Sequence, residues 1–280
     1  MAYNPNAVFI SPSTLSDFDK CPQLYYYKSV YRASSGLKIQ IINPSIALGQ
    51  VVHEAIDQIV KLPAVQWNKD RLFDIYEYLW KSIEGEKGGF MVSGVEPEFK
   101  NRGVEMLERF WANRHFREAE MIKLPTFPKV DLGNNLILTG KLDWIEKNGD
   151  FYHVIDFKTG KNDEKADSLQ LPIYAVLACG ILKSFNIRTS YWYIDRDNSL
   201  TDFPLPDINE TTRLLVWKGE IIVKARETNS FKCQSGRENC FYCRDIQSVA
   251  KGFGKLVAVD TTNYKQEIYI LPSTHDLVPF

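Results

Sequence analysis

The stretch from Leu136 to Gly160, LILTGKLDWIEKNGDFYHVIDFKTG, constrains the fold more than any other part of the chain. β-Forming residues alternate from Leu136 to Glu146, Asn148-Gly149 is a strong hairpin-turn signal, and Phe151 to Phe157 provides a second strand. We therefore expect a β-hairpin that sets three charged residues into otherwise apolar sequence: Asp143, Asp156 and Lys158.

The expected register places these charges on one side of the sheet. With Asn148-Gly149 as the two turn residues, Asp143 faces Val154 and lies diagonal to Asp156, roughly 7 to 8 Å away. Lys158 follows Asp156 by two residues and points to the same side, because side chains alternate along a strand. The intervening residues face the opposite way, toward the expected core: Ile155 and Phe157.

Two interpretations of this charged patch remain open from the hairpin alone. Burying such charges unpaired costs several kcal/mol each, so a metal ion bridging the two acids, with the lysine beside it, explains them economically. The alternative is a partly exposed network of ion pairs on a hairpin at the edge of a sheet.

Composition is that of a soluble globular protein. The 280 residues are 44% hydrophobic and 25% charged, a length that fits one large domain or two small ones. The formal net charge of −1 excludes a general positive field, so a nucleic acid must be met by a local basic patch. Because no apolar run reaches transmembrane length and the N-terminus lacks a signal-peptide pattern, we expect a cytoplasmic protein without membrane association.

Five cysteines are an odd number, and disulfides are disfavoured in a reducing compartment, so their spacing favours metal ligation. Cys240-x-x-Cys243, with Cys233 upstream, forms a local cluster. Cys21 lies far away in the sequence and on its own is better explained as a small buried residue. Cys179 falls in an apolar helical run and is expected to be buried.

Hydrophobic periodicity predicts the other elements. Residues 63–128 have a helical and aromatic pattern, and His53 borders the apolar face of an expected helix, where a packing role would be ordinary. Helices are expected over 11–31, 48–61, 168–182 and 207–229, strands over 127–132, 187–195 and twice within 255–271, and a loop over 36–44. This order predicts an α/β (α+β) domain with a mixed sheet.

Six short motifs occur in a defined order. They are S-x-S-x-L-x-x-F-x-x-C-P at 11–22, L-G-x-x-x-H at 48–53, G-K-L-D at 140–143, D-F-K-T-G at 156–160, Q-L-x-x-Y at 170–174 and the cysteines at 233–243. Each motif is weak alone. Taken together in this order, they resemble the RecB-like, AddB-like branch of the PD-(D/E)XK nuclease superfamily, including CRISPR-adaptation and phage-type exonucleases.

The resemblance implies a restriction-endonuclease-like core in a single domain over residues 1–280. Residues 63–128 would form a helical insertion, and the cysteine-cluster segment 230–250 would pack on the N-terminal helix. The implied activity is a metal-dependent deoxyribonuclease, an exonuclease on single-stranded DNA or DNA ends in DNA repair, recombination or CRISPR adaptation. DNA would be the partner, with a helicase or CRISPR-adaptation protein as a further one. One alternative is a catalytically inactive nucleic-acid-binding module with an Fe-S or Zn structural staple. The other is a zinc-stapled interaction protein in which the D-x-K residues form a surface ion pair.

The resemblance also implies the roles of individual residues. Lys158 would position and polarise the attacking water, and Gln170 and Tyr174 would orient Lys158 or the nucleic-acid strand. Oxygen and imidazole ligands suit Mg²⁺ or Mn²⁺. The implied metal ligands are the side chains of His53, Asp143 and Asp156 and the main-chain carbonyl of Phe157.

A second metal group is implied at the cysteines. Cys21, Cys233, Cys240 and Cys243 resemble the ligands of a [4Fe-4S] cluster, for which Zn²⁺ is the alternative. In the family the late cysteines usually run as a C-x2-C pair followed by a third. Here the pair is last and Cys233 precedes it, which leaves the type of metal group open.

Overall fold

The computed structural model describes residues 7–92, 94–233, 235–236, 240–262 and 264–271. The helices are α1 (Pro12–Lys20), α2 (Pro22–Tyr25), α3 (Pro44–Lys61), α4 (Lys69–Trp80), α5 (Val95–Ala112), α6 (Arg114–Glu118), α7 (Gln170–Leu182), α8 (Ile208–Glu227) and α9 (Arg244–Ala250). Shorter turns of helix are η1 (Tyr26–Val30), η2 (Ala64–Gln66) and η3 (Gly85–Gly88). The strands are β1 (Val8–Ile10), β2 (Lys38–Ile41), β3 (Glu120–Met121), β4 (Lys129–Gly133), β5 (Leu136–Thr139), β6 (Trp144–Asn148), β7 (Phe151–Phe157), β8 (Ile187–Trp192), β9 (Thr201–Phe203), β10 (Lys255–Asp260) and β11 (Gln266–Ile270).

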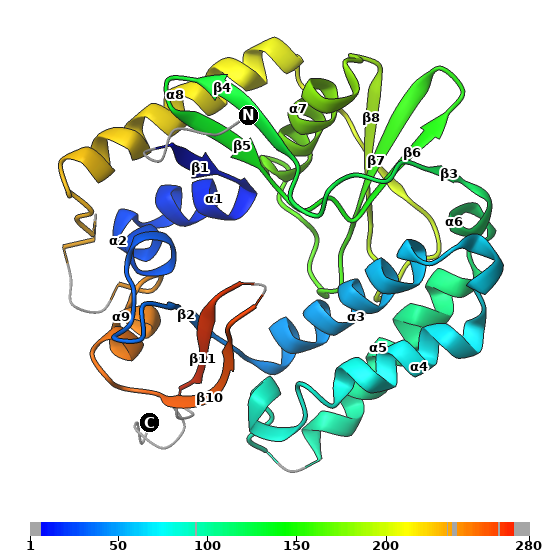
Figure 1. Ribbon diagram of the computed structural model, residues 1–280, viewed down its shortest axis with the longest axis horizontal. Helices are drawn as coiled ribbons and strands as arrows, with labels where there is room; N and C mark the ends of the chain where they lie inside the picture. The colour runs from blue at the N-terminus through cyan, green and yellow to red at the C-terminus, as the bar shows by residue number, and fades with distance from the viewer. Residues whose placement is uncertain (1–6, 93, 234, 237–239, 263, 272–280) are drawn as a thin grey trace.

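A five-stranded mixed sheet of order β3-β6-β7-β8-β9 forms the centre of the fold, and only its β7–β8 pair is parallel among the described strands. Ile155 and Phe157 pack on one face against the helical layer of α3, α4 and α5 (Figure 1). Val154 packs on the other face against α7. The predicted α/β mixed sheet and the inward orientation of Ile155 and Phe157 are therefore confirmed.

Two smaller sheets join distant parts of the chain. One has the order β1-β5-β4, and β4 at its edge confirms the predicted edge strand near residues 127–132. The other has the order β10-β11-β2, in which β11 near the C-terminus runs parallel to β2. The expected loop over 36–44 was therefore wrong, because residues 38–41 acquire their strand conformation only from this long-range pairing. The two strands expected within 255–271 are β10 and β11, and Asn263, between them, lies outside the described residues.

The hairpin differs from its prediction in two ways. Leu136 to Glu146 is not one strand: the chain leaves the β5 sheet and enters the central sheet across residues 140–143. The pairing of Asn148 with Phe151 makes Gly149-Asp150 the turn, because Gly149 takes the positive φ of 58° at the first turn position. The register is thus shifted by two residues, and an even shift keeps every side chain on its predicted face.

The first expected helix, over 11–31, is interrupted at Cys21. Cys21 has an extended backbone (φ −169°, ψ 119°) between α1 and α2. Pro22 explains the break, since proline disfavours helical conformation in the residue before it. Cys21 is therefore placed at a bend rather than inside a helix.

The remaining helices agree with their predictions to within a few residues. The one expected at 48–61 starts earlier, at Pro44, because the side chain of Asn43 caps it by accepting a hydrogen bond from the Ile46 N–H. Cys179 is buried, as expected. None of the helices in the described part of the chain has the length and apolarity needed to cross a bilayer.

Candidate active site and cysteine cluster

The two predicted acids meet at one end of the central sheet. Asp156 belongs to β7 and is 2% exposed, and extending the β6–β7 register by one residue places Asp143 opposite it. Because β7 is an interior strand of the sheet, the interpretation as an exposed ion-pair network on an edge hairpin is wrong. The spacing in the sequence predicted that Asp143 and Asp156 share one face of the hairpin, and the central sheet buries both side chains.

Asp143 is held from two sides. Its Oδ1 lies 2.8 Å from Nδ1 of His53, and its Oδ2 accepts a hydrogen bond of 2.9 Å from the N–H of Phe157. α3 carries His53 to this position because Gly49, one turn earlier, allows close packing: a Cβ there would lie 2.9 Å from Oγ1 of Thr159. The glycine of L-G-x-x-x-H therefore helps to bring the histidine of that motif to the aspartate.

Gln170, the first residue of α7, joins Lys158 to Asp156. Its Oε1 accepts a hydrogen bond of 2.5 Å from Nζ of Lys158, and its Nε2 donates one of 2.7 Å to Oδ1 of Asp156. The same Nε2 lies 3.3 Å from the hydroxyl of Tyr174, one turn along the helix. The spacing of Q-L-x-x-Y thus places both polar groups beside the acids.

Glu164 is a member of the site that sequence reasoning missed. Its Oε2 lies 2.8 Å from Nζ of Lys158, which also lies 2.9 Å from Oδ2 of Asp156. Glu164 falls in the loop before α7, where its charge looked like that of an ordinary solvated loop. Its only sequence signal is its position between D-F-K-T-G and Q-L-x-x-Y.

The charges strongly affect one another's ionisation. Burial, followed by the nearby carboxylate of Asp143, raises the pKa of Asp156 to about 7. Burial also opposes ionisation of Asp143, but His53 outweighs it and lowers the pKa of that carboxyl. For Lys158 burial favours the neutral amine, yet Asp156 and Glu164 prevail and raise its pKa, so its ammonium stays charged at neutral pH.

The donor set fits a hard divalent cation. Two carboxylates and an imidazole are ligands that Mg²⁺ and Mn²⁺ accept. Oδ2 of Asp156 is buried, and its contact of 2.9 Å with Nζ of Lys158 is an ion pair without hydrogen-bond geometry, which leaves a lone pair for a cation. His53 and Asp143 are in direct contact at 2.8 Å, but His53, Asp143 and Asp156 together are not grouped as closely as the four cysteines.

A large cleft opens beside these residues. Its volume is about 1200 Å³, and Gln170, Tyr174 and Glu164 form part of its wall. Four lysines and three aromatic side chains also line it: Lys20, Lys141, Lys165, Lys218, Phe127, Tyr242 and Tyr264. The rings of Tyr242, Tyr264 and Phe127 are 48%, 50% and 45% exposed. Four acids line the same wall, Asp19, Asp163, Glu164 and Asp167, and Lys218 is paired with Asp19. The cleft is therefore aromatic and mixed in charge, and its lysines and exposed rings are the groups that a nucleic acid could contact.

The four cysteines named by the resemblance come together. One sulfur from each of Cys21, Cys233, Cys240 and Cys243 lies within 4.8 Å of the others, and no other group of three or more such ligands is found in the described residues. The bend at Pro22 turns Cys21 toward the C-terminal segment, where α9 packs against η1. Figure 1 shows the N-terminal helices beside α9.

These sulfurs have the surroundings of metal ligands. Burial opposes ionisation of Cys240, but the N–H groups of Cys243 and Tyr242 contribute most to lowering its pKa to about 6. Burial and the neighbouring thiols raise the pKa of Cys243. Four thiolates at this separation repel one another unless a cation binds them, so the cluster fits a tetrahedral zinc or an iron–sulfur group.

The mixed sheet, the acids at adjoining strand positions and the following lysine define a restriction-endonuclease-like α/β protein. The sequence model of the PD-(D/E)XK nuclease superfamily matches residues 10–245, and the chain belongs to that superfamily. Membership implies a metal-dependent nuclease that acts on DNA. No curated protein matches the chain in sequence.

Proposed function

We propose that the protein is a RecB-like deoxyribonuclease that hydrolyses single-stranded DNA or DNA ends as an exonuclease. One observation carries the proposal: Asp143, Asp156 and Lys158 converge on one buried face with His53 and Gln170 bound to them. An inactive binding module would have no need to bury two acids side by side, where the charge of Asp143 helps to raise the pKa of Asp156. A role in DNA repair, recombination or CRISPR adaptation accords with this activity.

His53, Asp143, Asp156 and the main-chain carbonyl of Phe157 would hold Mg²⁺ or Mn²⁺. When bound there, such a cation would supply an activated water and stabilise the charge that develops on the scissile phosphate. Asp156 and Glu164 raise the pKa of Lys158, which favours a role for its ammonium as a hydrogen-bond donor that positions and polarises the water. Gln170 and Glu164 fix the direction of the Lys158 ammonium, and Tyr174 steadies Gln170.

The cleft supports a single-stranded substrate. Lysines neutralise phosphates, while exposed rings such as Tyr242 and Tyr264 stack on unpaired bases. Bases in a duplex are already stacked and cannot use these rings. Because the overall charge is nearly neutral, we further propose that a partner, such as a helicase or a CRISPR-adaptation protein, contributes part of the affinity for DNA.

The cysteine cluster complements this proposal. We assign it to a [4Fe-4S] cluster on the family resemblance, with Zn²⁺ as the alternative. In either case it joins Cys21 to the C-terminal segment and fixes α1, which contributes Ser16 to the wall of the cleft. The group is structural in this proposal and takes no part in hydrolysis.

The decisive experiment is a manganese-dependent assay on labelled DNA that is linear or circular and single- or double-stranded. Wild type is compared with Asp156→Ala and with Asp150→Ala, an exposed aspartate in the turn of the same hairpin. We expect cleavage of linear single strands by wild type and Asp150→Ala and loss of cleavage in Asp156→Ala. Undiminished cleavage by Asp156→Ala would exclude the proposed site.

A further inference from the structure

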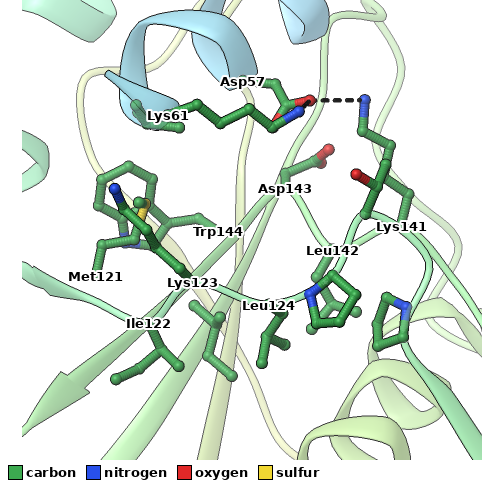
Figure 2. Close-up of a pocket in the computed structure, with 15 residues that line it drawn as sticks. Asp57, Lys61, Met121, Ile122, Lys123, Leu124, Lys141, Leu142, Asp143 and Trp144 are labelled. Atoms are coloured by element: carbon green, nitrogen blue, oxygen red, sulfur yellow. Dashed lines mark hydrogen bonds and ion pairs between the residues drawn. The ribbon is translucent and has the colours of Figure 1, made fainter. Parts of the chain in front are cut away.

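A second, smaller pocket lies beside Asp143 and is separate from the large cleft. Its volume is about 200 Å³, and its wall is formed by α3, the segment after β3 and the start of β6. Figure 2 shows Asp143 between the Asp57–Lys141 ion pair and the segment that carries Lys123 and Leu124. A ligand in this pocket would therefore touch the candidate metal site directly.

The pocket combines apolar walls with cations. The apolar part comes from both sides of the hollow: Val60, Met121, Ile122, Leu124, Pro125, Pro128 and Leu142. Lys61 and Lys141 share Asp57, at 2.8 and 3.4 Å from its Oδ2. Lys123 is exposed and makes no hydrogen bond or ion pair with any described residue. The carboxylates of Asp57 and Asp143 also line the pocket, but Asp57 is paired with the two lysines and Asp143 with His53. The remaining charge, at Lys123 beside the apolar walls, suits a ligand with an anionic group and a flat apolar part.

The pocket and the cleft meet at Lys141, which lines both. A strand lying along the cleft would have to pass Lys141 to reach the pocket. The pocket volume of about 200 Å³ is below the roughly 300 to 1,000 Å³ of sites for drug-sized ligands, so it has room for the base or the sugar of one nucleotide and not for several units.

We propose that this pocket binds the terminal nucleotide of the DNA strand, with its base or sugar between the apolar walls and its phosphate at Lys123. The proposal rests on the nuclease function proposed above and gives it a physical cause for cleavage next to a strand end. The end of a strand can enter a pocket of this size. An internal nucleotide cannot, because the pocket has no room for the strand to continue beyond it. The terminal phosphate can be a 5′- or a 3′-phosphate.

The test measures nucleotide binding independently of cleavage. Deoxyadenosine 5′-monophosphate and 3′-monophosphate are titrated into the protein as purified, without added Mg²⁺ or Mn²⁺, by isothermal titration calorimetry. Deoxyadenosine and inorganic phosphate serve as probes that lack one half of the ligand. The variants are Lys123→Ala and the control Lys81→Ala, an exposed lysine at the end of α4.

We expect at least one of the two monophosphates to bind more tightly than deoxyadenosine or inorganic phosphate. Lys123→Ala should raise the dissociation constant of that monophosphate about tenfold, the usual effect of losing a charge-assisted hydrogen bond. Lys81→Ala should bind like wild type. Absence of nucleotide binding, or equal binding by Lys123→Ala and wild type, would overturn the proposal. The preferred monophosphate identifies the terminus.

A second measurement separates this proposal from the proposed function. Leu124→Trp fills the pocket, and its products from linear single-stranded DNA should shift from mononucleotides to longer fragments. If wild type cleaves DNA but Leu124→Trp gives the same product lengths and nucleotides do not bind, the pocket proposal fails while the nuclease function stands. If wild type does not cleave DNA, the function fails, and the titration still decides whether the pocket binds a nucleotide.

Discussion

Gly49 on α3 lies so close to Thr159 that a Cβ on the glycine would be 2.9 Å from the threonine Oγ1. This contact joins the motif containing His53 to the D-F-K-T-G motif containing Asp156 and Lys158. The distance between α3 and the end of β7 therefore determines whether His53 reaches Asp143.

Gly49→Val is expected to reduce nuclease activity at least tenfold, because the added side chain pushes α3 away and lengthens the His53–Asp143 contact of 2.8 Å. Overpacking of this kind also destabilises by about 1–3 kcal/mol. The matched control is Gln50→Val, which places the same β-branched residue on the exposed face of the same helix. Equal activity of the two variants in the manganese assay would mean that the close contact does not position His53.

Lys158→Met is expected to lower the rate of cleavage roughly 10²- to 10³-fold, the usual effect of removing a preorganised donor. Affinity for Mn²⁺, measured by calorimetry, should not fall, since the lysine competes with the cation for Asp156. Lys161→Met, an exposed lysine of the adjoining loop, provides the control. A variant at Lys158 that cleaves at the wild-type rate would show that another group positions the water.

Cys21→Ser is expected to release the metal group and lower the melting temperature, because the group closes a long loop between the N-terminal helices and the C-terminal segment. Metal analysis and visible absorption of the purified proteins check this: iron with sulfide and a brown colour indicate [4Fe-4S], and stoichiometric zinc in a colourless protein indicates Zn²⁺. Cys179→Ser changes a buried cysteine outside the cluster and should keep the full metal content. Unchanged metal content in Cys21→Ser would remove Cys21 from the ligand set.

Acid is expected to weaken the fold through Glu146, which is 1% exposed. Trp144 donates a hydrogen bond of 2.7 Å to its Oε2, and Nε2 of His115 and Nδ1 of His153 lie 2.9 and 3.6 Å from its Oε1. Burial disfavours the carboxylate, but His153, Trp144 and His115 outweigh it and hold the pKa of Glu146 below its ordinary value. A lowered pKa in the folded state gives a stabilisation that is present above the unfolded pKa and is lost as pH falls through the folded one.

Glu146→Gln lacks this titrating group. At pH 7 it should be less stable than wild type by about 1–3 kcal/mol, as for other hydrogen bonds to buried charged groups. The difference in free energy of unfolding should shrink as pH falls from about 5 to 3. Urea denaturation at several pH values measures it, and a difference that does not change with pH would contradict the role of the carboxylate.

Local sequence determined much of this site. Side chains alternate along a strand, so Asp156 and Lys158 share a face in any register. The predicted pairing of the hairpin strands was shifted by two residues, and because two is an even number Asp143 still lies on the same face. Helical spacing likewise fixed Gln170 and Tyr174 on one side of α7. These relationships hold over a few residues and need no knowledge of the fold.

Tertiary structure decided the rest. β2 forms only by pairing with β11, and the chain turns from β5 into β6 where Gly140 packs against Tyr174, whose ring would lie 2.9 Å from a Cβ on the glycine. Glu164 reaches Lys158, and Lys123 reaches the pocket beside Asp143, only after loops far from any motif are folded over the sheet. Sequence alone thus determined which charges share an element, because that depends on backbone periodicity. The fold decided which elements meet and how deeply the charges are buried, because that depends on packing between distant segments.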